Sequence, residues 1–220
     1  GDGGSENGTL QLNCSQNSHG VKLSSPAHSS GQSYEMILPT TNITAGKFLK
    51  VDSVSGSGAT GIGQLSFADA GGNAPAFEAK RSQAAQSISN ETNTKIEFNT
   101  EIFDSASAYD HSTNYRFTPQ TAGKYFVYAR VMCRAETNGN LEVADISLRK
   151  NGSVIGNSRF DYQNSRGNNG TPVINQIVDM NGSSDYVEAW GQVKVNSGNA
   201  QFYNDGQERT IFGAFKLGGL

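Results

Sequence analysis

Apolar and polar residues alternate in short stretches along this chain, and no segment shows the three-and-four spacing of an amphipathic helix. Over residues 96–102, for example, Ile96, Phe98 and Ile102 alternate with Glu97 and Glu101. A period of two places alternate side chains on opposite faces of a strand, one buried and one wet. The pattern therefore predicts a strand over 96–102 and an all-β protein.

The predicted strands become longer in the second half of the chain. They are expected at residues 125–133, 143–150, 153–162, 173–180, 186–195 and 209–217. Asn151-Gly152 is a strong hairpin signal between two of them. The stretch 125–133 is apolar on both faces apart from Arg130, so it is expected between two sheets or at a subunit contact. Many strands with turns and no helix favour a β-sandwich.

Residues 1–73 have a different composition. They are rich in Ser, Gly and Thr and contain isolated apolar pairs such as Leu10/Leu12 and Val21/Leu23. This spacing predicts very short strands, with Ser53–Gly63 as a flexible hairpin tip or insertion. Strands of this length do not bury a core alone. Winding three copies around one axis would let each chain complete the core of the others.

Composition narrows the range of partners. Hydrophobic residues make up 35% of the chain, which carries 26 Gly and a formal net charge of −3. Clustered Lys and Arg, the footprint of a nucleic-acid-binding surface, are missing from the sequence. No apolar run is long enough to span a bilayer. We therefore expect neither a nucleic-acid partner nor membrane insertion.

The stretch Phe98–Tyr128 carries a family resemblance. Phe98-Asn99, Phe103-Asp104, Tyr109-Asp110, Thr113, Phe117-Thr118-Pro119 and Gly123 before Tyr125-Phe126 resemble the strand core of the C1q/TNF superfamily. The resemblance covers about residues 75–218, with the aromatic positions of the last strand shifted by one. It implies a homotrimeric jelly roll that binds and does not catalyse. In that family these aromatic, Pro and Gly residues are framework.

The first part of the chain resembles a different module. The runs beginning at Asn13, Pro26, Gln32, Leu38, Lys47 and Gln64 are similar to a module of fibre and appendage proteins of marine (cyanophage-type) bacteriophages. In those proteins it precedes varied C-terminal tips. With a joint at Gly71-Gly72-Asn73, the resemblance implies an extended, intertwined β-rich stalk over 1–73 and a jelly-roll head over 74–220.

Several acidic residues and a histidine are candidates for a catalytic or metal-binding site. Asp104, Asp110 and His111 lie in one predicted turn, where acidic side chains commonly stabilise the turn itself. Glu97 and Glu101, four apart on a strand, would stand about 13 Å apart, too far for a retaining glycosidase pair. These side chains are interpreted as turn and surface residues, and no catalytic site is expected.

The candidate metal-binding residues and the two cysteines are also interpreted as structural. Residues 179–185 resemble the start of a calcium loop but lack its distal Glu, so a β-turn at Asn181-Gly182 is favoured over a structural calcium ion. His19 and His28 could meet their symmetry mates around a metal, but packing or capping is favoured. Cys133 is expected as a buried free thiol, although a disulfide with Cys14 is an alternative. No cofactor is expected.

Polar loops are the candidate binding surface, because a rigid sandwich presents its connections for recognition. The loops at 137–140, 164–171 and 196–207 suit sugar hydroxyls through amide and guanidinium hydrogen bonds and ring stacking. Their candidate ligand-binding residues are Arg166, Asn168, Asn169, Phe202 and Tyr203. Ordinary surface turns are the alternative interpretation of the same loops.

These observations predict a non-enzymatic phage virion appendage, a tail fibre whose tip adheres to a host-surface glycan or protein. Its N-terminal side would join other virion proteins. A head or baseplate decoration with a structural role is the first alternative. A secreted C1q-like adhesion ligand would explain the head but not residues 1–73. A polysaccharide depolymerase is a further alternative, without a matching constellation of catalytic residues in the sequence.

Overall fold

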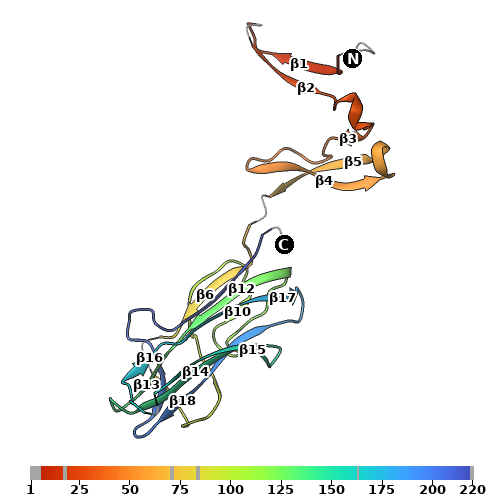
Figure 1. The fold of residues 1–220 in the computed structure, drawn as a ribbon. Coiled ribbons are helices and arrows are strands. Elements are labelled where there is room, and N and C mark those ends of the chain that lie inside the picture. Colours follow the sequence, from red (N-terminus) through yellow and green to blue (C-terminus); the bar gives the residue numbers. More distant parts are fainter. Residues whose placement is uncertain (1–5, 17–18, 70–71, 83–84, 163, 219–220) are drawn as a thin grey trace. The chain divides into compact units, whose positions relative to one another are not determined.

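The computed structural model describes residues 6–16, 19–69, 72–82, 85–162 and 164–218 (Figure 1). The chain forms two compact units, unit 1 over Gly1–Ala70 and unit 2 over Gly71–Leu220. Gly71, part of the joint predicted from sequence, lies outside the described residues. Among those that are described, no helix has the length and apolar character needed to cross a bilayer.

Unit 1 consists of strands and two short 3-10 helices. A hairpin pairs β1 with β2, and a second sheet has the order β3-β5-β4 with β3 and β5 parallel. The elements are β1 (Thr9–Asn13), β2 (Gly20–Ser24), η1 (His28–Ser30), β3 (Glu35–Ile37), β4 (Lys47–Ser55), η2 (Gly58–Thr60) and β5 (Ile62–Asp69). The predicted flexible loop was too long, because β4 continues through Ser55 and β5 already begins at Ile62.

Unit 1 leaves its apolar side chains uncovered. The register of the hairpin places Leu10 opposite Leu23 and Leu12 opposite Val21, so all four lie on one face. Their exposed fractions run from 59% to 74%. Leu65 is the one buried hydrophobic side chain in the described part of unit 1. As a single chain, this unit therefore has almost no hydrophobic core.

The described part of unit 2 contains strands and no helix. Three sheets have the orders β10-β11-β18-β14-β15 with β8 beside β18, then β17-β12-β20-β6-β9, and β16-β13-β19-β7. The strands are β6 (Ala76–Lys80), β7 (Gln86–Ile88), β8 (Thr94–Lys95), β9 (Thr100–Asp104), β10 (Tyr109–Asp110), β11 (Arg116–Phe117), β12 (Ala122–Arg130), β13 (Met132–Ala135), β14 (Leu141–Lys150), β15 (Ser153–Asp161), β16 (Asn169–Gly170), β17 (Val173–Asn181), β18 (Val187–Val195), β19 (Ala200–Tyr203) and β20 (Ile211–Lys216).

The strand order is that of a jelly roll. Four antiparallel pairs are nested along the chain: β6 with β20, β11 with β18, β12 with β17, and β14 with β15. The first strand thus pairs with the last, and the two sheets face each other across one core. The predicted all-β jelly-roll sandwich is confirmed by this topology.

Aromatic rings fill the core between the two large sheets. Phe77 stacks on Tyr109 and Phe117, with ring centroids 4.5 and 4.6 Å apart, and Phe212 meets Phe77 edge-on at 5.1 Å. The Tyr109 hydroxyl donates to the carbonyl of Phe98, which satisfies its polar end inside the core. Because aromatic pairs add about 0.5–1.5 kcal/mol each beyond the area they bury, this cluster ties the sheets together.

Several local predictions are confirmed. Asn151 and Gly152 have φ angles of 50° and 82° and join β14 to β15 as a tight hairpin. The predicted framework residues Phe98, Phe117 and Tyr125 are fully buried. The Asn-Gly signal thus identified the turn correctly, and the family resemblance identified these core positions.

Two predicted strands are broken in the structure. Residues 96–99 are not in a strand, since the chain leaves β8 beside β18 and then joins the other sheet as β9. Ile102, predicted on the buried face, is exposed. The stretch 125–133 likewise divides at Val131 into β12 and β13, which belong to different sheets. Both predictions of a continuous strand were wrong because the chain changes sheets there.

Candidate functional site

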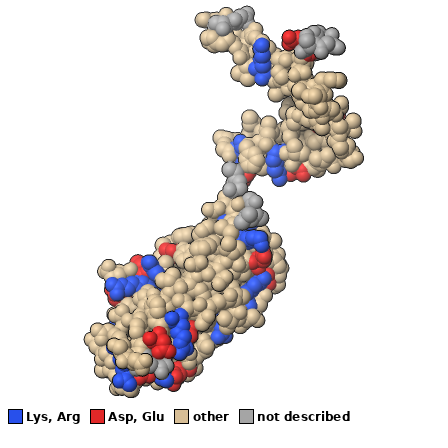
Figure 2. All heavy atoms as spheres, in the orientation of Figure 1, with Lys and Arg blue, Asp and Glu red and all other residues tan. Residues whose placement is uncertain are grey.

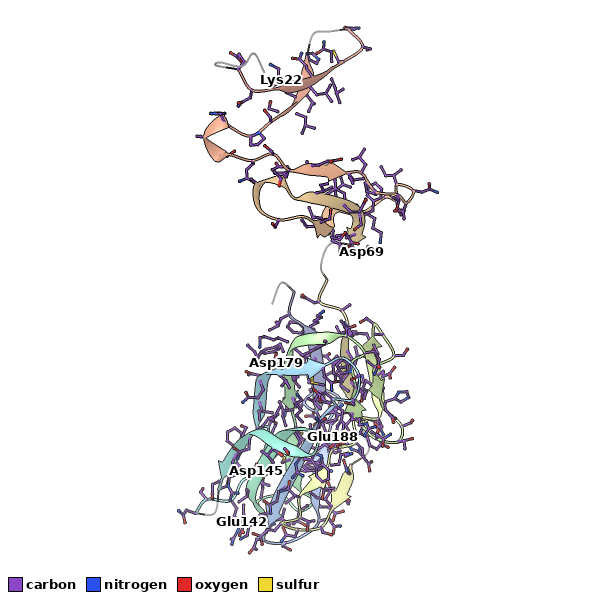
Figure 3. All side chains as sticks on the ribbon, turned by 90° about the vertical axis from the view of Figure 1, so that its right-hand side faces the viewer. Lys22, Asp69, Glu142, Asp145, Asp179 and Glu188 are labelled. Carbon is purple, nitrogen blue, oxygen red and sulfur yellow. The ribbon has the colours of Figure 1, made fainter. Side chains whose placement is uncertain are left out.

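The predicted binding loops gather at one end of unit 2, which we call the loop end, formed by residues 87–91, 136–142, 164–170 and 196–203. Backbone hydrogen bonds join these segments: Glu136 N to Asn199 O at 2.9 Å, Asn196 N to Asn140 O at 2.9 Å, and Leu141 N to Gly167 O at 3.0 Å. The two termini of unit 2 meet at the opposite end, where Lys216 N donates to Asn73 O. Figure 3 shows Glu142 and Asp179 toward these two ends.

Arg166 is fixed within the loop end by two partners. Its Nε donates to Glu142 Oε1 at 2.8 Å, and its Nη2 donates to Asn196 Oδ1 at 3.1 Å. Lys194 lies 3.9 Å from the same Glu142 carboxylate and 3.0 Å from Glu91. Two cations therefore balance two carboxylates, and Arg166 holds loops together through its Nε and Nη2 donors.

Asn168 and Asn169 have different surroundings. The side-chain oxygen of Asn168 accepts the backbone N–H of Gly139 at 2.8 Å, which joins two of the predicted loops. Asn169 is exposed in β16 and pairs with Arg134 of β13. Asn168 thus supports the loop backbone, while the Asn169 side chain faces solvent.

The two aromatic candidates are also separated by the structure. Phe202 lies in β19 and is fully buried, so the prediction that it lies on a surface loop was wrong. The alternation of the strand turns its neighbour outward: Tyr203 is half-buried, and the Arg134 guanidinium stacks over its ring at 3.4 Å. The Arg134 Nε also donates to Gln201 Oε1 at 2.9 Å. The surface therefore carries Tyr203 stacked with Arg134, whereas the sequence predicted that the rings of both Phe202 and Tyr203 are free to bind a ligand.

A hollow of about 370 Å³ opens at the loop end, and none of the five predicted binding residues lines it. Its walls are the segment from Ser87 to Asn90 and the segment from Gly198 to Ala200. Sequence reasoning did not name the first wall. It comes to lie here because β7 pairs with β19, more than a hundred residues later in the chain, and no local pattern signals such a pairing.

The acidic turn before β11 is structural. Asp104 accepts the backbone N–H groups of Ala106 and Tyr109, at 3.1 and 2.7 Å. Burial of the Asp110 carboxylate favours its neutral form, but backbone N–H groups of residues 112–114 and the Asn114 side chain donate to it and together hold its pKa well below the usual range. The predicted interpretation of these carboxylates as turn residues is confirmed.

His111 and the two glutamates lie in separate pairs. His111 Nδ1 lies 2.7 Å from Glu101 Oε1 at the surface. Glu97 lies instead beside Arg81, with 3.6 Å between its carboxylate and the guanidinium. The assumption that Glu97 and Glu101 share one strand was wrong, because residue 97 precedes β9.

The loop at 179–185 closes as a turn. The Asn181 side-chain oxygen accepts the backbone N–H groups of residues 183, 184 and 185. Asp185 is paired with Lys150 at 2.8 Å, and Asp179 with Lys124 at 2.8 Å. Within the described ranges, no three His, Cys, Asp or Glu side chains are grouped to hold a metal. The packing or capping role favoured for His19 and His28 over a shared metal site stays a prediction.

The outward face of the sheet β17-β12-β20-β6-β9 forms a second surface, which we call the apolar face. Phe126 lies opposite Ile177 on one side and Phe215 on the other, with 5.4 Å between the two Phe ring centroids. Val173 and Ile177 are exposed on it, and Phe103 lies at its β9 edge. Figure 2 shows Lys, Arg, Asp and Glu interspersed on the face it draws, without an extended region of one sign.

Comparison with known proteins gives matches in structure alone. No family model matches the sequence, and no curated protein matches it. Among the similar solved structures is Eiger TNF from S. frugiperda, with 9% identity, 66% of this chain and 93% of that chain covered, and a TM-score of 0.48. The globular domain of zebrafish complement 1qA has 15% identity, coverage of 65% and 96%, and a TM-score of 0.42. Murine APRIL has 10% identity, coverage of 64% and 98%, and a TM-score of 0.45.

Proposed function

We propose that this chain is a non-enzymatic subunit of a phage virion appendage, a tail fibre that trimerises and adheres to a host-surface glycan or protein through the loop end of unit 2. The observation that carries the proposal is the uncovered apolar surface of unit 1. A unit with Leu65 as its one buried hydrophobic side chain in the described part does not bury enough apolar area to fold alone. Neighbouring copies would supply the missing core.

Unit 2 offers a matching surface for self-association. The apolar face places Phe126, Ile177 and Phe215 side by side without a covering element among the described residues. Exposed aromatic and aliphatic side chains in one contiguous patch are typical of subunit interfaces. Three copies meeting there would leave the loop end of each copy free.

The position in a virion rests on the similarity of residues 13–70 to fibre and appendage modules of marine phages. Unit 1 would then be the stalk, which joins other virion proteins on its N-terminal side, and unit 2 the tip. The net charge of −3 argues against a nucleic-acid partner. Three tips acting together would raise avidity without a tight single site.

The trimer is tested by light scattering on a matched pair of variants. Ile177→Asp places a charge in the apolar face, whereas Val154→Asp places one at a similarly exposed position on the other sheet. We expect the mass of three chains for the unaltered protein and for Val154→Asp, and a smaller mass for Ile177→Asp. An unaltered chain that is monomeric at micromolar concentration would overturn the proposal.

Adhesion is tested by incubating fluorescently labelled trimer with a panel of marine cyanobacterial strains. Binding to at least one strain, lost on competition with unlabelled trimer, is the expected result. Trimer that binds none of the strains would contradict the receptor-binding role and favour a structural decoration of the head or baseplate.

A further inference from the structure

The hollow at the loop end is lined by neutral polar groups. Its open polar side chains include Ser87, Ser89 and Asn199, and no Lys, Arg, Asp or Glu lines it. Its volume of about 370 Å³ is in the lower range of small-ligand pockets. Hydroxyl and amide groups donate and accept hydrogen bonds without bringing a charge, so the lining suits an uncharged polar ligand.

Not all of these groups are used inside the protein. The Asn90 side chain is bonded to the backbone of Val195. Its Oδ1 accepts the Val195 N–H at 2.8 Å, and its Nδ2 donates to the Val195 carbonyl at 3.1 Å. Asn199 Nδ2 donates to Glu136 Oε2 at 2.8 Å. Within the described part of unit 2, the Ser89 hydroxyl and Asn199 Oδ1 have no hydrogen-bond partner. The Ser89 hydroxyl, which can donate and accept, and Asn199 Oδ1, which can accept, are thus available to a ligand from opposite walls.

The charges around the hollow do not favour an ionic ligand. Arg166 and Lys194 are neutralised by Glu142 and Glu91. Arg134 is stacked over Tyr203 and donates to Gln201, and the Glu136 carboxylate, which accepts from Asn199, would repel an anion. Because no Lys or Arg lines it, the hollow differs from the Arg- or Lys-based sites that hold sulfate, phosphate or carboxylate groups.

Close backbone contacts hold the segments that form both walls. Gly198 has a φ of +79°, and a Cβ there would stand 2.8 Å from Thr137 Oγ1, so the loop lies tightly against its neighbour. Directly after the other wall, Glu91 has a φ of 55°, an uncommon conformation for this residue, and its N–H donates to Val193 O. Walls that are already in place cost little to order when a ligand binds.

We infer that this hollow binds one neutral sugar residue of a surface polysaccharide, with Ser89 and Asn199 as its hydrogen-bonding groups. The inference rests on the proposed adhesive function and names the ligand class for its loop end. Because no charge is exchanged, binding is expected to be nearly independent of salt, unlike adhesion to an acidic polysaccharide.

The test uses methyl NMR on the intact assembly. Ile88 and Ala200 border the hollow, so their methyl groups report on binding there, while that of Ile177 lies on the apolar face and serves as an internal control. Glucose, galactose, mannose and N-acetylglucosamine are titrated as neutral probes, and glucuronate as an anionic probe. We expect saturable shifts of Ile88 and Ala200 with at least one neutral sugar, equal at about 50 and about 500 mM NaCl.

A matched pair of variants identifies the site. Ser89→Trp would fill the hollow at an exposed position, whereas Ser153→Trp places the same side chain in the exposed hairpin turn beside Asn151-Gly152. Ser89→Trp should weaken sugar binding at least about tenfold, or 1.4 kcal/mol, with Ser153→Trp unchanged. Shifts with glucuronate alone, a strong salt dependence or full binding by a folded Ser89→Trp would overturn the inference.

Failure of this inference is distinguishable from failure of the proposed function. If Ser89→Trp trimer still adheres to a strain that the unaltered trimer binds, the adhesive role stands and the hollow is not its site. If the sugars shift Ile88 and Ala200 but no strain is bound, the sugar site stands and the proposed role fails.

Discussion

The hydroxyl of Tyr128 donates a 2.6 Å hydrogen bond to the Glu78 carboxylate, reaching across the whole width of β20, the strand between them. Gly213 is the residue of β20 that the tyrosine ring crosses. Burial, followed by the Glu78 carboxylate, raises the pKa of Tyr128, so the phenol stays a donor throughout the accessible pH range. A side chain at residue 213 would occupy the space of the ring.

Replacing this glycine should therefore destabilise unit 2. Gly213→Ala would collide with the Tyr128 ring and also approach the backbone carbonyl of Phe77 at 3.0 Å. We expect a loss of about 1–3 kcal/mol in the free energy of unfolding, measured by chemical denaturation. Gly167→Ala is the control, since its Cβ would meet nothing closer than 3.7 Å. Equal stability of the two variants would contradict the packing described here.

Asp110 should contribute to stability only above acidic pH. Its folded pKa lies below its unfolded value of about 3.9, so the contribution is present above that value and is lost as the pH falls toward the folded pKa. Asp110→Asn should cost roughly 1 kcal/mol at pH 7, and the difference from the unaltered protein should shrink as the pH falls from about 5 to about 2. Melting temperatures across this range measure it.

The exposed pair of Asp179 with Lys124 provides the control for this titration. Asp179→Asn removes the same charge, but exposed ion pairs contribute about 0–1 kcal/mol. A gap between Asp110→Asn and the unaltered protein that stays constant with pH would show that the amide donors of the turn do not hold the charge.

Cys133 should be chemically silent in the folded protein. It is fully buried, and desolvation, with a smaller effect from Asp145, raises the pKa of its thiol. In a Cys14→Ser variant, a thiol-specific reagent should label nothing until denaturant is added, and then one thiol per chain. Prompt labelling of the native variant would contradict the burial of Cys133.

Arg166 should restrict the local motion of the loops more than it raises the stability of the whole unit. Arg166→Ala removes the donors to Glu142 and Asn196, and surface pairs of this kind contribute about 0–1 kcal/mol. Hydrogen exchange at the Asn196 amide should become faster while the melting temperature changes little. Arg159→Ala, which loses pairs with Asp145 and Asp161 on the sheet, should leave that amide unchanged.

Local sequence signals predicted the parts of the fold that depend on neighbours along the chain. Asn151-Gly152 specifies its own turn, because both residues adopt positive φ easily. Phe117 and Tyr125 alternate with polar or half-buried neighbours and are buried as expected. In such places the side-chain period of two determines which face meets the core.

The errors arise where the chain changes sheets. Residues 96–102 alternate as a single strand would, yet the segment leaves β18 and joins β6, a step set by long-range pairing. Phe202 lies in a polar stretch that resembles a loop, but pairing with β7 and β13 places its ring in the core. The hollow was missed for the same reason, since its walls meet only after these pairings form.

Asn73 and Lys216 are joined by a backbone hydrogen bond, so the chain enters and leaves unit 2 at one end, and the nine residues of β12 alone carry it about 27 Å toward the other. A unit of this kind can be exchanged as a whole domain. Exchanging residues 73–216 for another jelly roll would replace every wall of the hollow at once and require only one junction region to be preserved. Insertions in the loops at 137–140 or 164–168 would likewise alter recognition without disturbing that junction.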